Sequence, residues 1–167
     1  MPIPTWAVGQ VLSASDVNTY FVPLVAIKPS DQSITSNVTP ATDSALFVPM
    51  AATATYEIDC FIIYSGGTQG AADIKFLFTG PASSVNLYTA AYVNTAGNPV
   101  ASIYLDGSAS NQAGTNGAGN KRVITIKGTA VTAGTSGNLN FQWSQGSSSG
   151  TATIVAARSF LSLTRIS

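Results

Sequence analysis

The fold is decided by residues 55–80, which read TYEIDCFIIYSGGTQGAADIKFLFTG. Apolar side chains recur at every second position from residue 56 to residue 64, and the acidic Glu57 and Asp59 stand between them. A glycine-rich break follows, and the alternation resumes over residues 73–78. A period of two residues is typical of β-strands, whereas a helix needs apolar residues three and four positions apart. We therefore predict a β-hairpin at the centre of a sheet, with one face packed and the other partly exposed to water.

Similar short runs fill the remainder of the chain from Leu24 onward. We predict about eight to ten short strands, because turn residues recur at intervals of about ten. This spacing favours an all-β fold, an antiparallel two-sheet β-sandwich of jelly-roll or Greek-key type, over an up-and-down barrel. We expect Pro40 and Asp43 to mark a turn, Val85 and Leu87 to be buried, and the low-complexity residues 106–120 to form a mobile surface loop. The sandwich domain is thus predicted to span residues 24–167.

The first 23 residues differ from this pattern and carry the one helical signal. Ser13 and Asp16 have the spacing of a capping box, and Leu12 can pack on Val17 as a hydrophobic staple. The helix should end before Pro23, because the residue preceding a proline avoids helical angles. A helix this short must dock on something. It either covers one end of the sandwich or binds a neighbouring protein through apolar side chains, and the candidates are Trp6, Val11, Leu12, Val17, Tyr20 and Phe21.

The composition restricts the possible partners. Of the 167 residues only 8% are charged, against about 25% in a typical domain, and the net charge is zero. Nucleic-acid binding needs a basic stripe, but the only adjacent basic pair is Lys121 and Arg122. No apolar run is long enough to cross a bilayer. We predict no nucleic-acid partner and no membrane insertion, and we expect a weakly charged surface of this kind to lie against other protein.

Few side chains suited to catalysis are present. The chain has no histidine and a single cysteine, Cys60, which we expect to be a buried and inert thiol. Glu57 and Asp59 share one strand face, where we expect them to oppose Lys or Arg across a strand. No metal-ligand cluster or cofactor-binding motif is recognisable. The sequence therefore predicts a protein that is not an enzyme, with no catalytic residue, no metal and no cofactor.

Three tyrosines near Gly/Asn-rich loops allow two interpretations. Tyr88, Tyr92 and Tyr104 could form a surface platform for a host cell-surface glycan, since aromatic rings stack on sugars. They could instead be core or subunit-interface residues, which is the commoner role of such side chains. The second interpretation is favoured.

The sequence resembles a group of phage proteins over nearly its whole length. Residues 5–21, TWAVGQVLSASDVNTYF, resemble the opening of minor tail and virion proteins from tailed phages of Gram-positive, especially actinobacterial, hosts. The body resembles the β-domain often attached to that opening. The matching segments are KPSDQSITSN (28–37), YEI (56–58), DIKF (73–76), FTGP (78–81), NLNFQW (138–143) and residues 159–166.

The resemblance implies a structural role in the virion. Such domains assemble as homotrimers, and their N-terminal segment docks on other virion proteins, either major capsid or tail proteins. It implies a capsid decoration or head-fibre protein or a small minor tail protein. The alternative is a tail-fibre module that contacts host receptors or carbohydrate. We expect the chain, whose start lacks a secretory signal, to be made in the host bacterial cytoplasm and located in the virion.

Overall fold

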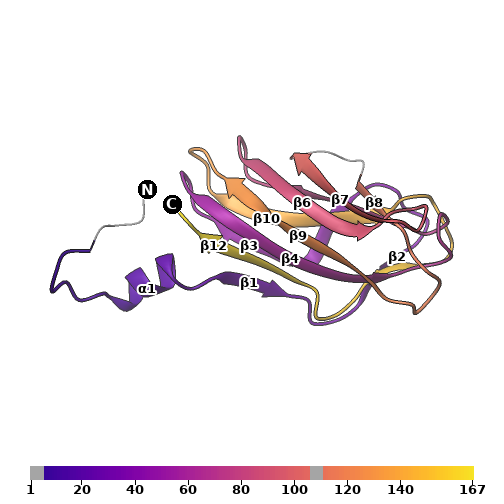
Figure 1. The fold of residues 1–167 in the computed structure, drawn as a ribbon, viewed down its shortest axis with the longest axis horizontal. Coiled ribbons are helices and arrows are strands. Elements are labelled where there is room, and N and C mark those ends of the chain that lie inside the picture. Colours follow the sequence, from indigo (N-terminus) through magenta and orange to yellow (C-terminus); the bar gives the residue numbers. More distant parts are fainter. Residues whose placement is uncertain (1–5, 106–110) are drawn as a thin grey trace.

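Two antiparallel sheets pack face to face, and a short helix lies near the N-terminus (Figure 1). The computed structural model describes residues 6–105 and 111–167. The predicted two-sheet β-sandwich is confirmed.

The large sheet holds eight of the described strands. Six of them follow the order β1-β12-β4-β9-β6-β7, while β11 pairs with β4 and with β2. Their bounds are β1 Leu24–Ile27, β2 Gln32–Ile34, β4 Thr55–Ser65, β6 Val85–Val93, β7 Pro99–Leu105, β9 Arg122–Val131, β11 Thr153–Val155 and β12 Phe160–Arg165. The small sheet has the order β3-β10-β5-β8. Its bounds are β3 Ala41–Met50, β5 Ile74–Thr79, β8 Asn111–Ala113 and β10 Gly137–Gln145.

The predicted hairpin at residues 55–80 is wrong, although both of its strands exist. Strand β4 pairs with β9, β11 and β12 in the large sheet, whereas β5 pairs with β10 and β8 in the small sheet. The connection at residues 66–73 therefore crosses from one sheet to the other. It is held by Asp73, whose carboxylate accepts hydrogen bonds from the N–H groups of Gly70 and Thr115. Alternation along a strand reports which residues share a face, but not which strand lies beside it.

The core lies between the two sheets. The inward face of β4 is fully buried from Tyr56 to Tyr64 and includes Cys60. Across from it, the small sheet contributes a group of aromatic rings, in which Phe141 packs on Phe76 and Phe78 at centroid distances of 6.3 and 5.8 Å. These aromatic rings stabilise the packing of the two sheets, since each ring buries a large apolar area.

The face that β6 turns to the core is the opposite of the predicted one. Val85 and Leu87 are exposed, while Tyr88 points inward. Tyr88 is paired in register with Gly128 of β9, and a Cβ at Gly128 would lie 2.6 Å from the Tyr88 Cβ. The glycine makes room for the tyrosine inside the sandwich. Successive side chains of a strand point to opposite faces of the sheet. Because Tyr88 points to the core, Val85 and Leu87 point to the outside.

The low-complexity stretch is also more ordered than predicted. Residues 106–110 lie outside the described residues, and residues 116–120 form a largely exposed turn. Between them, β8 pairs with β5 and buries Asn111, and the Thr115 side chain is buried against Asp73. Strand pairing uses the backbone, so a segment with few apolar side chains can still add to a sheet.

Asp43 stands within β3 and is buried, so the turn predicted at this position is wrong. The Lys28 ammonium lies 2.8 Å from both carboxylate oxygens of Asp43 and also donates to the Gln32 side chain. Trp143 Nε1 donates to the same carboxylate at 2.9 Å. Each charge is thus fully hydrogen-bonded inside the protein, as a buried ion pair requires. The pair ties the end of β1 in the large sheet to β3 and β10 in the small one.

Candidate docking surface

The N-terminal segment carries the helix α1, Ala14–Tyr20, and begins it as the sequence predicted. Ser13 Oγ accepts the Asp16 N–H at 3.1 Å, and the Asp16 carboxylate accepts the Ser13 N–H at 3.0 Å, which completes a capping box. Hydrogen bonds from the Ser13 hydroxyl and then from its backbone lower the pKa of the Asp16 carboxyl. Phe21 caps the C-terminus of the helix, and its N–H donates to the Val17 carbonyl oxygen.

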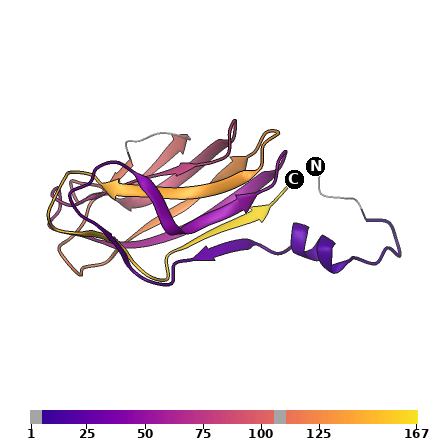
Figure 2. The same ribbon diagram turned by 180° about the vertical axis from the view of Figure 1, so that it is seen from behind.

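This segment lies beyond one end of the sandwich (Figures 1 and 2). Its contact with the body is made by Tyr20, whose ring lies 5.5 Å from the guanidinium carbon of Arg165 on β12. Trp6 packs edge-on against Tyr20 at a centroid distance of 6.4 Å. A groove of about 390 Å³ separates the segment from the sandwich. The lining residues are Asn18, Val22, Leu24, Pro49, Met50, Ala51, Tyr56 and Arg165.

The six candidate docking residues divide into two groups. Trp6 and Tyr20 are partly buried against each other, so they hold the segment in shape. The other four are exposed, and Val11 reaches 88%. Val8, which the sequence analysis did not single out, is fully exposed as well. In the sequence, Val8 could have been found only as an apolar side chain in a segment without strand or helix periodicity. The four exposed candidates are Val11, Leu12, Val17 and Phe21.

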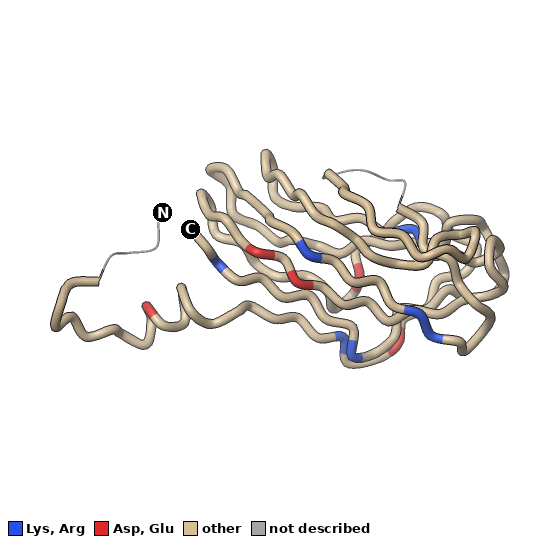
Figure 3. The backbone as a smooth tube through the Cα atoms, viewed as in Figure 1, with Lys and Arg blue, Asp and Glu red and all other residues tan. Residues whose placement is uncertain are grey.

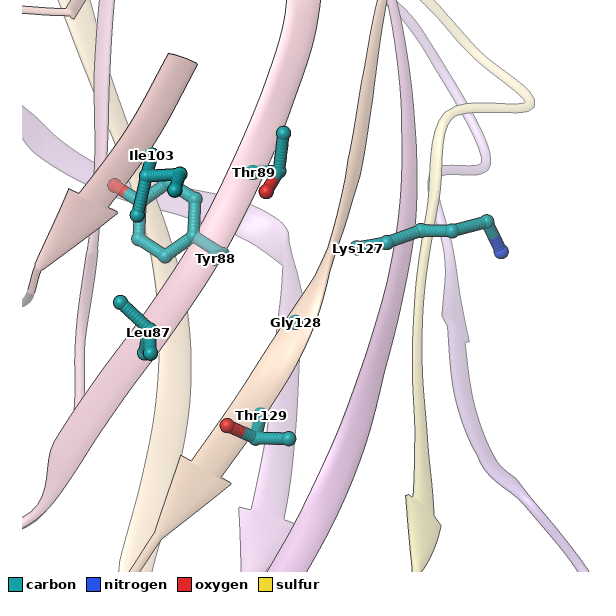
Figure 4. A pocket seen from close by; sticks show the side chains of 7 residues that line it. All are labelled: Leu87, Tyr88, Thr89, Ile103, Lys127, Gly128 and Thr129. Atoms are coloured by element: carbon teal, nitrogen blue, oxygen red, sulfur yellow. The ribbon is translucent and has the colours of Figure 1, made fainter. Parts of the chain in front are cut away.

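A second apolar surface lies on the outer face of the large sheet, where β6, β7 and β9 run side by side. Its side chains are exposed and come from three adjacent strands, and Ile103 is the most exposed at 74%. We call these five residues the β6–β7 patch: Val85, Leu87, Ile103, Leu105 and Val131. Beside Leu87 and Ile103 lies a shallow pocket of about 270 Å³, which Thr89, Lys127 and Thr129 also line (Figure 4). The sequence analysis missed this surface because it assigned Val85 and Leu87 to the core.

Charged groups are few and spread over the molecule (Figure 3). Asp59 stands opposite Lys127 across β4 and β9, with the ammonium 3.2 Å from the carboxylate, so the predicted cross-strand pairing is confirmed for Asp59. Glu57 is exposed and stands opposite Thr129 and Thr164. The described residues contain no group of three or more histidines, cysteines or acids placed to hold a metal ion. Nor does any helix among them have the length and hydropathy to cross a bilayer.

The three tyrosines lie on the core side of β6 and β7, with Tyr88 buried and Tyr92 and Tyr104 partly exposed. Tyr88 is only 1% exposed and packs edge-on against Phe78 at 5.2 Å. The hydroxyl groups of Tyr92 and Tyr104 hydrogen-bond to each other, and both rings pack against the core. Burial raises the pKa of Tyr92 well above the usual value. The buried Tyr88 has no face open to a glycan, while for the partly exposed Tyr92 and Tyr104 the glycan-contact interpretation stays a prediction.

Comparison with solved structures gives distant likenesses. No family model and no curated protein matches the chain. The tripod from the baseplate of bacteriophage Tuc2009 is 12% identical over 96% of this chain and 72% of that one, with a TM-score of 0.38. Two infectious bursal disease virus structures, the Gx strain and a VP2 subviral particle, are 12% and 10% identical with TM-scores of 0.28 and 0.26. They cover 87% and 89% of this chain but only 41% and 42% of theirs. Similarity at this level transfers neither an activity nor a partner to this chain.

Proposed function

We propose that this chain is a non-enzymatic structural protein of a phage particle, attached through its N-terminal segment. The observation that carries the proposal is the position of that segment beyond the sandwich, with Val8, Val11 and Phe21 uncovered by their own chain. Exposed apolar side chains on a short segment are typical of a surface that another protein covers. The resemblance of residues 5–21 to virion proteins gives the class of that partner.

The engagement of the acidic groups supports the non-enzymatic part of the proposal. Asp43 is neutralised by Lys28, Asp59 pairs with Lys127, and Asp16 caps the helix. Asp31 accepts the N–H of Ala157, and Asp73 holds the connection between the sheets. Carboxylates used in this way hold backbone and side chains in place. We therefore assign them structural roles.

We further propose that the protein is a homotrimer that acts as a capsid decoration or head-fibre protein or as a small minor tail protein. A weakly charged sandwich suits packing between copies, because repulsion between subunits is small. The number of copies per particle distinguishes the two placements. Quantitative mass spectrometry of purified particles should give hundreds of copies for a capsid protein and a handful for a tail protein.

Removal of residues 1–21 tests the attachment. The truncated protein should fold and associate with itself as the full chain does, but it should not bind particles assembled without this protein. The double variant Val11→Asp, Phe21→Asp should bind about tenfold more weakly or worse, the effect of losing at least 1.4 kcal/mol of apolar contact. Val38→Asp is the matched control, since Val38 is an exposed valine in a loop of the sandwich. Full-strength particle binding by the truncated protein would refute the proposal.

A further inference from the structure

The sequence contains one asparagine that is followed directly by glycine, Asn116 before Gly117, in the turn between β8 and β9. Asn116 is exposed, and Gly117 has a φ of +91°, which favours glycine. In such a pair the backbone nitrogen of the glycine can attack the side-chain amide carbon of the asparagine, because no Cβ on the glycine hinders the approach. The pair is therefore a candidate site of spontaneous modification.

The reaction is a deamidation whose only co-reactant is water. The Gly117 nitrogen loses its proton to solvent and forms a bond to Asn116 Cγ, while the bond from Cγ to the side-chain nitrogen breaks and that nitrogen takes up a proton and leaves as ammonia. Water then opens the resulting succinimide ring at one of its two carbonyl carbons. One product is aspartate, and the other is isoaspartate, in which the backbone runs through Cγ. Either product carries one new carboxylate.

The fold holds the attacking nitrogen away from this reaction. The Gly117 N–H donates to the Gly67 carbonyl oxygen at 2.9 Å, and the Thr115 hydroxyl donates to the same oxygen at 2.9 Å. Thr115 is fully buried, and its N–H donates to the Asp73 carboxylate at 2.8 Å. A nitrogen whose hydrogen is engaged in this way cannot lose its proton and turn to Cγ until the hydrogen bond opens.

Further contacts hold the turn closed. The Asn120 side chain donates to the Asn116 carbonyl oxygen at 2.8 Å, and the Asn120 N–H donates to the Gly117 carbonyl oxygen at 3.2 Å. A Cβ on Gly66 would lie 2.7 Å from Thr115 Cγ2, so the turn packs closely on the connection between the two sheets. The turn must therefore separate from this connection, a local opening, before Gly117 can react.

We propose that Asn116 is a self-modification site whose deamidation is controlled by the separation of residues 115–117 from Gly67. In the isoaspartate product the Gly117 nitrogen is bonded to Cγ, which lengthens the backbone by one atom. The hydrogen bond to Gly67 then cannot form again in the same geometry. The modification is thus a one-way step that loosens the turn from the inter-sheet connection. It does not depend on the proposed function.

Incubation of the purified full-length protein in warm, mildly alkaline buffer tests the site. Peptide mass spectrometry measures the conversion of each asparagine to acid, with and without denaturant. In denaturant Asn116 should convert faster than every other asparagine. In the folded protein its conversion should be slower by about tenfold or more, which corresponds to an opening free energy of at least about 1.4 kcal/mol. Equal rates in the two conditions, or no preference for Asn116 in denaturant, would overturn the proposal.

Hydrogen exchange of the unmodified protein measures the opening directly. The Gly117 amide should be protected, because its hydrogen is donated to Gly67. Its protection factor should match the fold-slowing of deamidation, since both reactions need the same opening. A Gly117 amide that exchanges as fast as in an unfolded chain would overturn the proposal. This measurement needs no substitution, so it holds even if a variant fails to fold.

A pair of threonine variants separates local opening from global unfolding. Thr115→Val removes the hydroxyl bonded to Gly67 and keeps the branched shape, so deamidation of the folded protein should become about fivefold faster. Thr132→Val is the matched control. Thr132 is also buried, and its hydroxyl donates to the Ala51 carbonyl oxygen at 2.7 Å, near the opposite end of β4 from Gly67. The control should leave the rate unchanged, and equal acceleration in both variants would overturn control by the local contact.

Discussion

Lys28 and Asp43 form an ion pair inside the sandwich, with the ammonium 2.8 Å from each carboxylate oxygen and both side chains almost completely shielded from water. The Asp43 carboxylate also accepts the N–H groups of Ala45 and Leu46 and the indole N–H of Trp143. It thereby fixes the conformation of β3 as well as its place in the sandwich. We assign the ion pair a structural role, because the hydrogen-bond donors around it all have acceptors within the protein.

Replacement of Asp43 should be one of the most destabilising single changes in the protein. Asp43→Ala leaves the Lys28 charge buried and unpaired, and we expect a loss of about 3–5 kcal/mol in the free energy of unfolding. Urea denaturation followed by Trp fluorescence measures it. Asp59→Ala, which breaks the exposed pair with Lys127, is the control and should cost less than about 1 kcal/mol. Equal losses in the two variants would contradict the structural role assigned to the buried pair.

Gly128 should not tolerate a side chain. Gly128→Ala places a Cβ 2.3 Å from the Leu87 carbonyl oxygen and 2.6 Å from the Tyr88 Cα, and we expect a cost of about 1–3 kcal/mol from overpacking. The control is Gly134→Ala, because no atom lies within 4 Å of a Cβ at that turn position. Its stability should stay within about 0.5 kcal/mol of wild type. Denaturation curves that coincide for the two variants would show that β6 and β9 can move apart without penalty.

The capping box should make the helix α1 sensitive to acid. The pKa of Asp16 is lowered in the folded protein from its ordinary value of 3.8, so its contribution to the helix is complete above that pH and is lost as the pH falls through the lowered value. Amide hydrogen exchange in residues 14–20 should therefore speed up in that acid range relative to the strands. Asp16→Asn should remove most of this pH dependence. An unchanged profile in Asp16→Asn would mean that another group controls the helix.

Cys60 should be unreactive while the protein is folded. Its side chain is fully buried, and burial raises the pKa of the thiol well above the usual value. Because the thiolate is the reacting form, an aromatic disulfide reagent should label Cys60 only at the rate of unfolding. Labelling should become rapid in denaturant. Rapid labelling under native conditions would indicate that the sandwich opens at β4.

The sequence predicted features that depend on neighbouring residues and failed on those that depend on distant ones. The strand at Tyr56–Tyr64 and the capping box of Ser13 and Asp16 follow from local spacing, and both are present. The partner of β4 does not follow, because alternation does not encode pairing. The ion pair was missed for the same reason, since Lys28 and Asp43 lie 15 positions apart in the chain, and Trp143, which donates to the same carboxylate, lies 100 positions from Asp43.

The second apolar surface shows a different limit. Strand β6 has apolar side chains at positions on both of its faces, so its periodicity alone does not decide which face is buried. The decision comes from Gly128 on β9, which leaves space for Tyr88 and no space for a second side chain. A sequence analysis would need the register between these two strands to place Val85 and Leu87 correctly.

The position of Lys28 determines how a mechanical load on the N-terminal segment would reach the body of the protein. Lys28 is the first fully buried side chain met along the described chain, directly after the short strand β1. Tension applied ahead of β1 would strip the four residues Leu24–Ile27 from β12 and then reach the bond between Lys28 and Asp43. That ion pair joins the two sheets. The load would therefore be distributed over both sheets, and the strands would not detach one after another.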